Sequence, residues 1–164
     1  MLDKLQQLNE EERQELYDAI PVITVLIAGA DGDIDDDELA QSEKITKIRS
    51  FSGSESMQSF YEKVGEDYSE RLQRWLKVVS KDTAERTADL SARLEKLNPI
   101  LAKLDPEWGA EMYKSFTSFA KHVAKASGGF LGIGSINKEE AELIDLPMLT
   151  PIVWEIEEED TSEE

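Results

Sequence analysis

The sequence predicts an all-α protein, a helical bundle of about six to seven helices that contains a duplicated helix-turn-helix element. Apolar residues recur every three or four positions along most of the 164 residues, which is the spacing of one helix face. Several of these segments follow an Asn or Asp with a Glu three residues later, a pattern typical of helix N-termini. No segment alternates apolar and polar residues between turn dipeptides, so no β-sheet is expected.

The first long helix is expected to begin after Asn9, which can cap it together with Glu12. Its apolar stripe widens to almost the full circumference from Val22 onward, so this helix should be central and buried. Pro21 lacks a backbone donor, which predicts a kink or a break just before it. Gly32 is expected to end the helix by adopting a left-handed conformation.

Further helices are expected at about residues 35–51, 54–80, 82–104, 106–128 and 137–146. Gly65 lies inside the second of these and is expected to weaken it without ending it. Pro99 should kink or restart the third. Asp105 and Pro106 provide the N-cap and first-turn proline that are typical of a helix start. A glycine-rich loop, residues 128–134, leads into the last helix.

The length and the 40% hydrophobic content indicate one globular domain with a sizeable core, expected over residues 1–152. Residues 153–164 are expected to form an acidic, flexible tail. Seven of the ten residues from 155 to 164 are acidic, so this segment cannot bury enough apolar surface to order itself.

The formal net charge is −18, with 36 acids against 18 lysines and arginines. Such a surface repels nucleic acid, so the expected partners are cations or an unidentified basic protein. The chain has no cysteine and no recognisable secretion signal, and its longest apolar run is too short to span a membrane. A cytoplasmic protein, monomeric or dimeric, is therefore expected.

No enzymatic activity is predicted. His122 is the only histidine, and without a second imidazole or a thiol it has no partner for nucleophilic catalysis. The glycine-rich loop lacks the Lys-Ser or Lys-Thr of a phosphate-binding loop, so a nucleotide site is not expected. Neither catalytic residues nor an organic cofactor are assigned.

Residues 30–38 form an acidic junction between the first two long helices, with six acids in the eight residues 31–38. Aligned with the calcium loop of an EF-hand, the junction supplies the acids, turn glycine and terminal glutamate of the second half of that loop. The first two ligand positions fall on Ile27 and Gly29, which have no side-chain oxygen, so a complete EF-hand is excluded. What remains is a half-site for calcium or another divalent cation, with a dissociation constant on the order of 10⁻⁴ to 10⁻³ M. Its metal ligands would be Asp31, Asp33, Asp35 and Glu38.

Helix capping is the alternative interpretation of the same residues. Asp35 can serve as an N-cap with Glu38 as its capping-box partner, and Gly32 as the cap of the preceding helix. Capping does not require Asp31 or Asp33, and crowding so many like charges costs free energy unless a cation or water screens them. Both interpretations stay open from the sequence.

A degenerate copy of the junction lies 102 residues further on, where Gly134–Glu140 aligns with Gly32–Glu38. The glycine, an isoleucine, an Asx residue at the expected cap and the terminal glutamate coincide. The second copy lacks the acid before its glycine, so it is expected to bind a cation worse or not at all.

An apolar helix that ends in Ala-Asp-Gly, followed by x-Ile-Asp-x-x-Glu, resembles the tellurite-resistance TerB-like family. The resemblance is carried by Ala30–Glu38 and by the copy at Gly134–Glu140. It implies a helical domain linked to tellurite and general stress response, with a divalent-cation site at the four acidic residues named above and, as an alternative to a basic protein, a membrane-associated protein partner. The leading hypothesis is therefore a non-enzymatic domain whose weak calcium binding is coupled to protein interaction. The alternative is an acidic adaptor or structural domain that binds a basic partner without metal.

Overall fold

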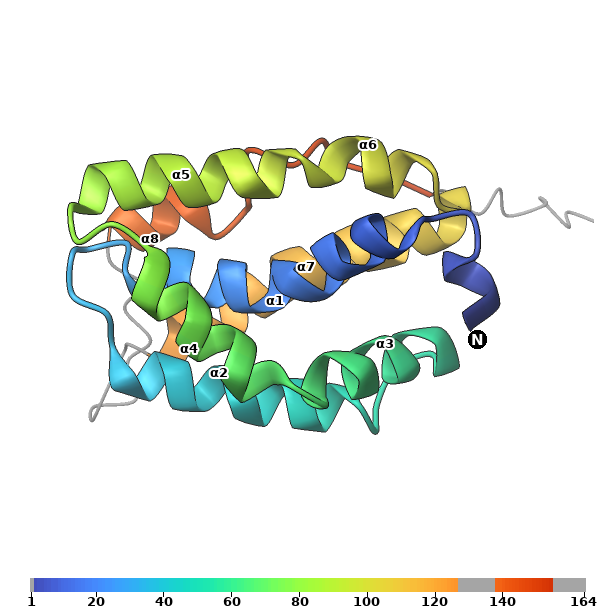
Figure 1. Cartoon of the computed structure of the whole chain (residues 1–164), viewed down its shortest axis with the longest axis horizontal. Helices are drawn as coiled ribbons and strands as arrows, with labels where there is room; N and C mark the ends of the chain where they lie inside the picture. Colours follow the sequence, from blue (N-terminus) through green and yellow to red (C-terminus); the bar gives the residue numbers. More distant parts are fainter. Residues whose placement is uncertain (1, 127–137, 155–164) are drawn as a thin grey trace, which may run out of the picture.

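The computed structural model describes residues 2–126 and 138–154, and all regular secondary structure in these ranges is helical. In chain order the elements are η1 (Leu2–Leu5), α1 (Glu10–Ala28), α2 (Asp36–Arg49), α3 (Glu55–Gly65), α4 (Tyr68–Val78), α5 (Thr83–Glu95), α6 (Leu97–Ala102), α7 (Pro106–Ala126) and α8 (Lys138–Leu143). The all-α prediction is confirmed, and the helices assemble into a bundle (Figure 1). None of these helices is long and apolar enough to cross a membrane.

The central element is α1, which packs against α2, α4, α5 and α7 (Figure 1). Asn9 and Glu12 form the predicted capping box at its start. Every residue from Ala19 to Ala28 is buried, as the wide apolar stripe predicts. The helix continues through Pro21, so the predicted break does not occur. Packing on several sides offsets the lost hydrogen bond and the steric clash of an interior proline, which cost about 3 kcal/mol.

The predicted helix over residues 54–80 is in fact two helices, α3 and α4, so the expectation that Gly65 would not end it is wrong. The chain changes partners at this point, because α3 packs mainly on α2 and α4 packs mainly on α1. Gly65 is the last residue of α3, and Asp67 precedes α4 with its carboxylate bound to Arg71 at 2.9 Å. The apolar spacing runs through the bend unchanged, which is why periodicity alone predicts one helix.

The predicted restart near Pro99 is confirmed. Because α5 ends at Glu95 and α6 begins at Leu97, Pro99 lies in the first turn of α6, where a missing amide breaks no helical hydrogen bond. The start of α7 at Pro106 is also as predicted, and Asp105 accepts hydrogen bonds from backbone N–H groups of its first turn.

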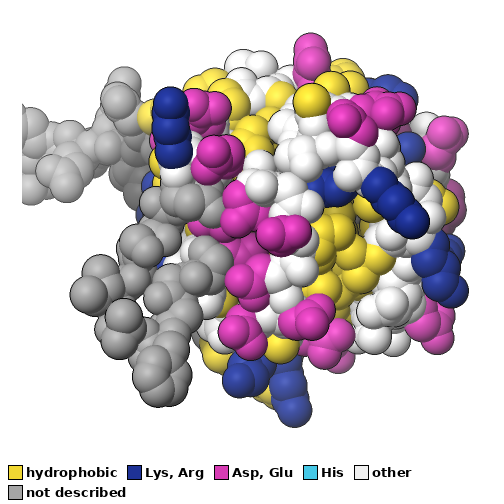
Figure 2. Space-filling model, turned by 90° about the vertical axis from the view of Figure 1, so that its left-hand side faces the viewer, with side chains coloured by type: hydrophobic (Ala, Val, Ile, Leu, Met, Phe, Trp, Pro, Cys, Tyr) yellow, Lys and Arg dark blue, Asp and Glu magenta, His cyan; other side chains and the backbone are white. Residues whose placement is uncertain are grey.

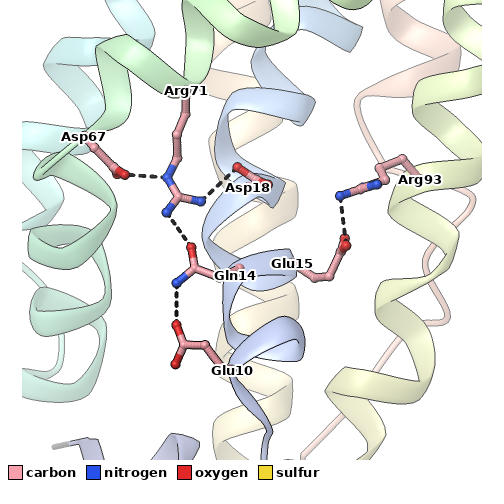
Figure 3. A network of polar contacts seen from close by, with 7 residues as sticks. All are labelled: Glu10, Gln14, Glu15, Asp18, Asp67, Arg71 and Arg93. Carbon is pink, nitrogen blue, oxygen red and sulfur yellow. Dashed lines mark hydrogen bonds and ion pairs between the residues drawn. The ribbon is translucent and has the colours of Figure 1, made fainter.

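Two arginines on outer helices bind carboxylates of α1 (Figure 3). Arg71 of α4 donates from Nε to Asp67 and from Nη1 to Asp18 of α1, each at 2.9 Å. Arg93 of α5 donates to Glu15 of α1 at 2.8 Å. These charge-assisted contacts fix the positions of α4 and α5 relative to α1. We call the contacts of Arg71 and Arg93 with these three carboxylates the Arg71 network.

The buried apolar side chains form one continuous core cluster. Its largest members lie on α3 and α7, where Phe60 and Tyr61 meet edge to face at 5.3 Å and Tyr61 stacks on Phe119 at 6.5 Å between ring centroids. The division into a domain over residues 1–152 and a tail over 153–164 stays a prediction, because most of that tail lies outside the described residues.

Candidate functional site at the acidic junction

The acidic junction connects α1 to α2 at one end of the bundle, the left end in Figure 1. The connection between α4 and α5 reaches the same end (Figure 1). The two connections touch, because a Cβ added at Gly32 would lie 3.1 Å from Oγ1 of Thr83, the first residue of α5. The start of α5 therefore packs against the junction and supports it.

A buried arginine lies under the junction. Arg86 of α5 is 4% exposed and donates from Nη2 to the carbonyl oxygen of Gly29 at 2.8 Å and from Nη1 to that of Ser80 at 3.2 Å. Gly29 follows the last residue of α1, and its carbonyl oxygen also accepts the N–H of Gly32 at 3.1 Å, so the guanidinium is a second donor to it and places positive charge at the negative end of the helix dipole. Sequence reasoning missed this residue. The available signal was its position four residues before Leu90, on the apolar face of α5.

The turn uses two glycines for different reasons. α1 ends at Ala28 with Gly29 as its C-cap, so the prediction that Gly32 ends the helix is wrong. Gly29 makes room for the arginine below it, since a Cβ there would lie 3.0 Å from Arg86 Nε. Gly32 has φ +104°, a conformation that other residues rarely adopt, and it reverses the chain after the helix has already ended.

Asp35 caps α2 as the capping interpretation predicts. Its Oδ1 accepts the backbone N–H of Asp37 at 2.8 Å and that of Glu38 at 3.2 Å. Asp31 makes a similar local turn, because its Oδ1 accepts the N–H of Asp33 at 3.1 Å. Two of the four predicted metal ligands thus have a side-chain oxygen already engaged by the backbone.

The four predicted ligands differ in exposure. Asp31 and Asp33 are exposed, Asp35 is half-buried, and Glu38 has 0% of its surface exposed. Within residues 2–126 and 138–154, no three or more His, Asp or Glu side chains are grouped so that they could hold a metal ion. The structure brings the four residues into one turn without arranging them as a coordination shell.

The exposed carboxylates of the junction give this end of the molecule a strong negative charge. Asp31, Asp33, Asp36 and Asp37 are all exposed, and no ion pair joins the last three to a described residue. Figure 2 views this end directly and shows acidic side chains gathered over its centre, next to apolar ones.

The helix ends that meet here contribute partly exposed apolar residues. Leu39 lies in the first turns of α2, and Leu76 and Val79 lie at the end of α4, all packed on the edge of the core. Val78 is 73% exposed. The end of the bundle therefore combines negative charge with apolar surface, a combination suited to recognising a basic, partly apolar segment.

The second copy of the junction can be compared only in part, since residues 127–137 lie outside the described part of the chain. α8 begins at Lys138, which is the position equivalent to Asp36 at the start of α2. Glu140 is 2% exposed, so the terminal glutamates of both copies, Glu38 and Glu140, are buried. The repeat thus preserves the helix start and the buried glutamate.

Two other predicted features fall elsewhere. His122 is exposed on α7, with Nδ1 2.7 Å from the carbonyl oxygen of Ser118. The glycine-rich loop over residues 128–134 lies outside the described residues.

Comparison with models of protein families, with curated proteins and with solved structures gives no match for this chain. The TerB-like assignment therefore stays a resemblance that rests on the residues of the junction.

Proposed function

We propose that the protein is a non-enzymatic interaction domain whose acidic junction binds a basic segment of a partner protein without a metal. One observation carries this proposal: Asp33, Asp36 and Asp37 are exposed at one end of the bundle and have no ion pair with a described residue. Like charges so close in sequence repel each other, and a cationic partner relieves that repulsion.

The apolar side chains beside the junction favour a particular kind of partner. Leu39 near the start of α2 and the end of α4, including Val78, offer apolar contact area at the same end of the bundle as the carboxylates. An amphipathic helix that carries lysines or arginines along one edge would place its apolar face here and its cations on the aspartates. Charge would steer the encounter, and apolar contact would supply much of the affinity.

The preference for a metal-free site follows from what the junction groups already contact. The Oδ1 atom of Asp35 caps α2, so using that oxygen for a cation would remove the cap. Arg86 already supplies a buried positive charge beneath the turn, which would repel a divalent cation above it. A cation that took Asp35 Oδ1 as a ligand would thus compete with the cap of α2, whereas a peptide bound on the outer surface of the turn would not.

Weak divalent-cation binding at the same junction, coupled to partner binding in a tellurite or stress response, is the second candidate function. The burial of Glu38 favours it, because this carboxylate stands where the calcium-loop alignment expects the bidentate glutamate. Calcium titration of chelator-treated protein tests it, with magnesium and sodium chloride at equal ionic strength as controls. Amide shifts confined to residues 31–38 and specific to calcium would favour this function.

The test of the proposed function uses a synthetic lysine- and leucine-containing amphipathic peptide as the probe, added to the protein in EDTA. We expect saturable binding with amide shifts over residues 31–39 and 76–85. Replacing Asp33, Asp36 and Asp37 together by Asn should weaken this binding about tenfold or more.

A matched control distinguishes local recognition from the attraction of any acidic surface. Glu62, Glu70 and Glu95 are exposed and distant in sequence from the junction, so changing them to Gln removes the same number of charges. That variant should bind the peptide nearly as well as the unmodified protein. Equal weakening in both variants would reject a specific site.

A further inference from the structure

A second polar surface lies at the opposite end of α2 from the acidic junction. A cavity of about 280 Å³ opens between the end of α2, the start of α3 and the outer face of α7. The residues around it that matter here are two cations, Arg49 and Lys114, and four hydroxyl side chains, Ser52, Ser54, Ser115 and Ser118. We call it the Arg49 pocket. Because α2 has 14 residues, the pocket and the junction are separated by about 20 Å along this helix.

Arg49 is held in a fixed direction by neutral groups. Nη1 donates to the Tyr61 hydroxyl and to the carbonyl oxygen of Ser115, each at 2.9 Å, and Nη2 donates to Ser118 Oγ at 2.7 Å. The guanidinium also lies over two aromatic rings, 5.3 Å from the centroid of Tyr61 and 5.5 Å from that of Phe119. These contacts orient the cation while leaving its charge in place.

No carboxylate forms an ion pair with Arg49 among the described residues, and none does so with Lys114. This differs from Arg71 and Arg93, whose guanidinium groups both bind acids. The helix dipole accounts for a cation at the end of α2 but not for Lys114 on α7.

The acid that lines the pocket, Glu111, is turned toward a different group. Its Oε1 accepts a hydrogen bond from the Ser54 hydroxyl at the start of α3. One carboxylate against two cations leaves the pocket positive. Ser54 also caps α3, so the amide groups of that helix's first turn add further positive potential beside the hydroxyls.

We propose that the Arg49 pocket binds a phosphate group, either as inorganic phosphate or as a small phosphate monoester. Phosphate suits a fixed guanidinium beside a flexible ammonium better than a carboxylate does, because it has more acceptor oxygens and up to two charges. The volume decides the size of the ligand. About 280 Å³ lies at the lower limit of small-molecule sites, so a phosphoamino acid fits and a nucleotide does not.

The experiment titrates the full chain with sodium phosphate and, separately, with O-phospho-L-serine, and follows amide shifts by NMR. Sodium chloride at equal ionic strength and L-serine are the controls. We expect saturable shifts over residues 49–57 and 114–118 with both phosphates and with neither control. Tighter binding of phosphoserine would identify the monoester as the ligand, and equal binding would identify inorganic phosphate.

Variants test the two cations. Lys114→Gln should weaken phosphate binding about tenfold, since it removes one charge-assisted contact. Lys44→Gln is the matched control, because Lys44 is also exposed and does not line the pocket, and it should change binding less than about twofold.

Arg49→Gln should abolish binding, and Arg49→Lys should restore part of it. Because Arg49 also holds α2 against α7, thermal melting must accompany these two variants. Lys114→Gln keeps the proposal testable even if they fail to fold. Absence of saturable shifts, or equal affinity of Lys114→Gln and Lys44→Gln, would overturn the proposal.

Discussion

The Arg71 network and the acidic junction are both rich in charge, but they differ in how that charge is compensated. In the network, Arg71 contacts carboxylates of α1 and of the α3–α4 bend at 2.9 Å, so opposite charges pair across helices. In the junction, Asp33, Asp36 and Asp37 stay exposed without such partners, and the buried cation below, Arg86, binds backbone carbonyls. The first arrangement stabilises the fold, and the second leaves negative charge available to a ligand.

Arg86→Met should produce the largest loss of stability, because it removes the base of the junction. The carbonyl of Ser80 would lose its Arg86 donor and that of Gly29 would keep only the N–H of Gly32, while the buried positive charge at the end of α1 would be lost, so we expect a loss of about 3 kcal/mol in the free energy of unfolding. Urea denaturation measures it. Arg86→Lys keeps the charge and should lose less. A loss below about 1 kcal/mol for the methionine variant would mean that the buried guanidinium is not what supports the turn.

Arg71→Met should have the next largest effect. It leaves Asp18 and Asp67 without their cation in partly buried positions, which we expect to lower the free energy of unfolding by about 2 kcal/mol. The same denaturation experiment checks this. Lys63→Met is the control, since its ion pair with Glu66 is exposed and should contribute less than about 1 kcal/mol. Equal effects of the two changes would show that the network is no stronger than a surface pair.

Gly32→Ala should lower stability by about 1 kcal/mol, because alanine disfavours φ +104°. Gly53→Ala is the comparison variant, because it separates the backbone strain of a positive φ from steric crowding of the added Cβ. Gly53 also has positive φ, at +86°, but a Cβ there would meet nothing within 4 Å, whereas one at Gly32 would lie 3.1 Å from Thr83 Oγ1. The Gly32 variant should therefore lose more stability than the Gly53 variant. The opposite order in thermal melting would contradict the contact between the turn and α5.

The smallest effect on stability is expected where the effect on binding is largest. Replacing Asp33, Asp36 and Asp37 by Asn relieves repulsion but removes acids near the N-terminus of α2, so the free energy of unfolding should change by no more than about 0.5 kcal/mol. Circular dichroism during urea denaturation measures the change. A loss well above this value would place the three aspartates with the Arg71 network, as groups that hold the fold together.

Much of the fold could be predicted from the sequence because helix starts are local signals. The neighbours of Asn9 and Asp105 alone predict that these residues are caps, and both cap their helices in the structure. The division between α3 and α4 could not be predicted in this way. Gly65 and Asp67 interrupt an apolar spacing that continues on both sides, and only the different partners of the two helices explain the bend.

The residues of the candidate site can be predicted from the sequence, but their arrangement in space cannot. The acidic run and the capping role of Asp35 follow from local chemistry. The contact of Arg86 with Gly29 joins residues 57 positions apart, so no local pattern reveals it. The same holds for the Arg49 pocket, whose two cations come from helices that meet only in the folded bundle.

The most direct test of metal-free recognition at the junction is titration of the chelator-treated protein with the basic amphipathic peptide, once in EDTA and once in calcium. We expect equal affinity in the two solutions, with amide shifts over residues 31–39 and 76–85 that disappear in the triple asparagine variant. Binding that requires calcium, or that persists unchanged in that variant, would contradict the account and would favour the cation site.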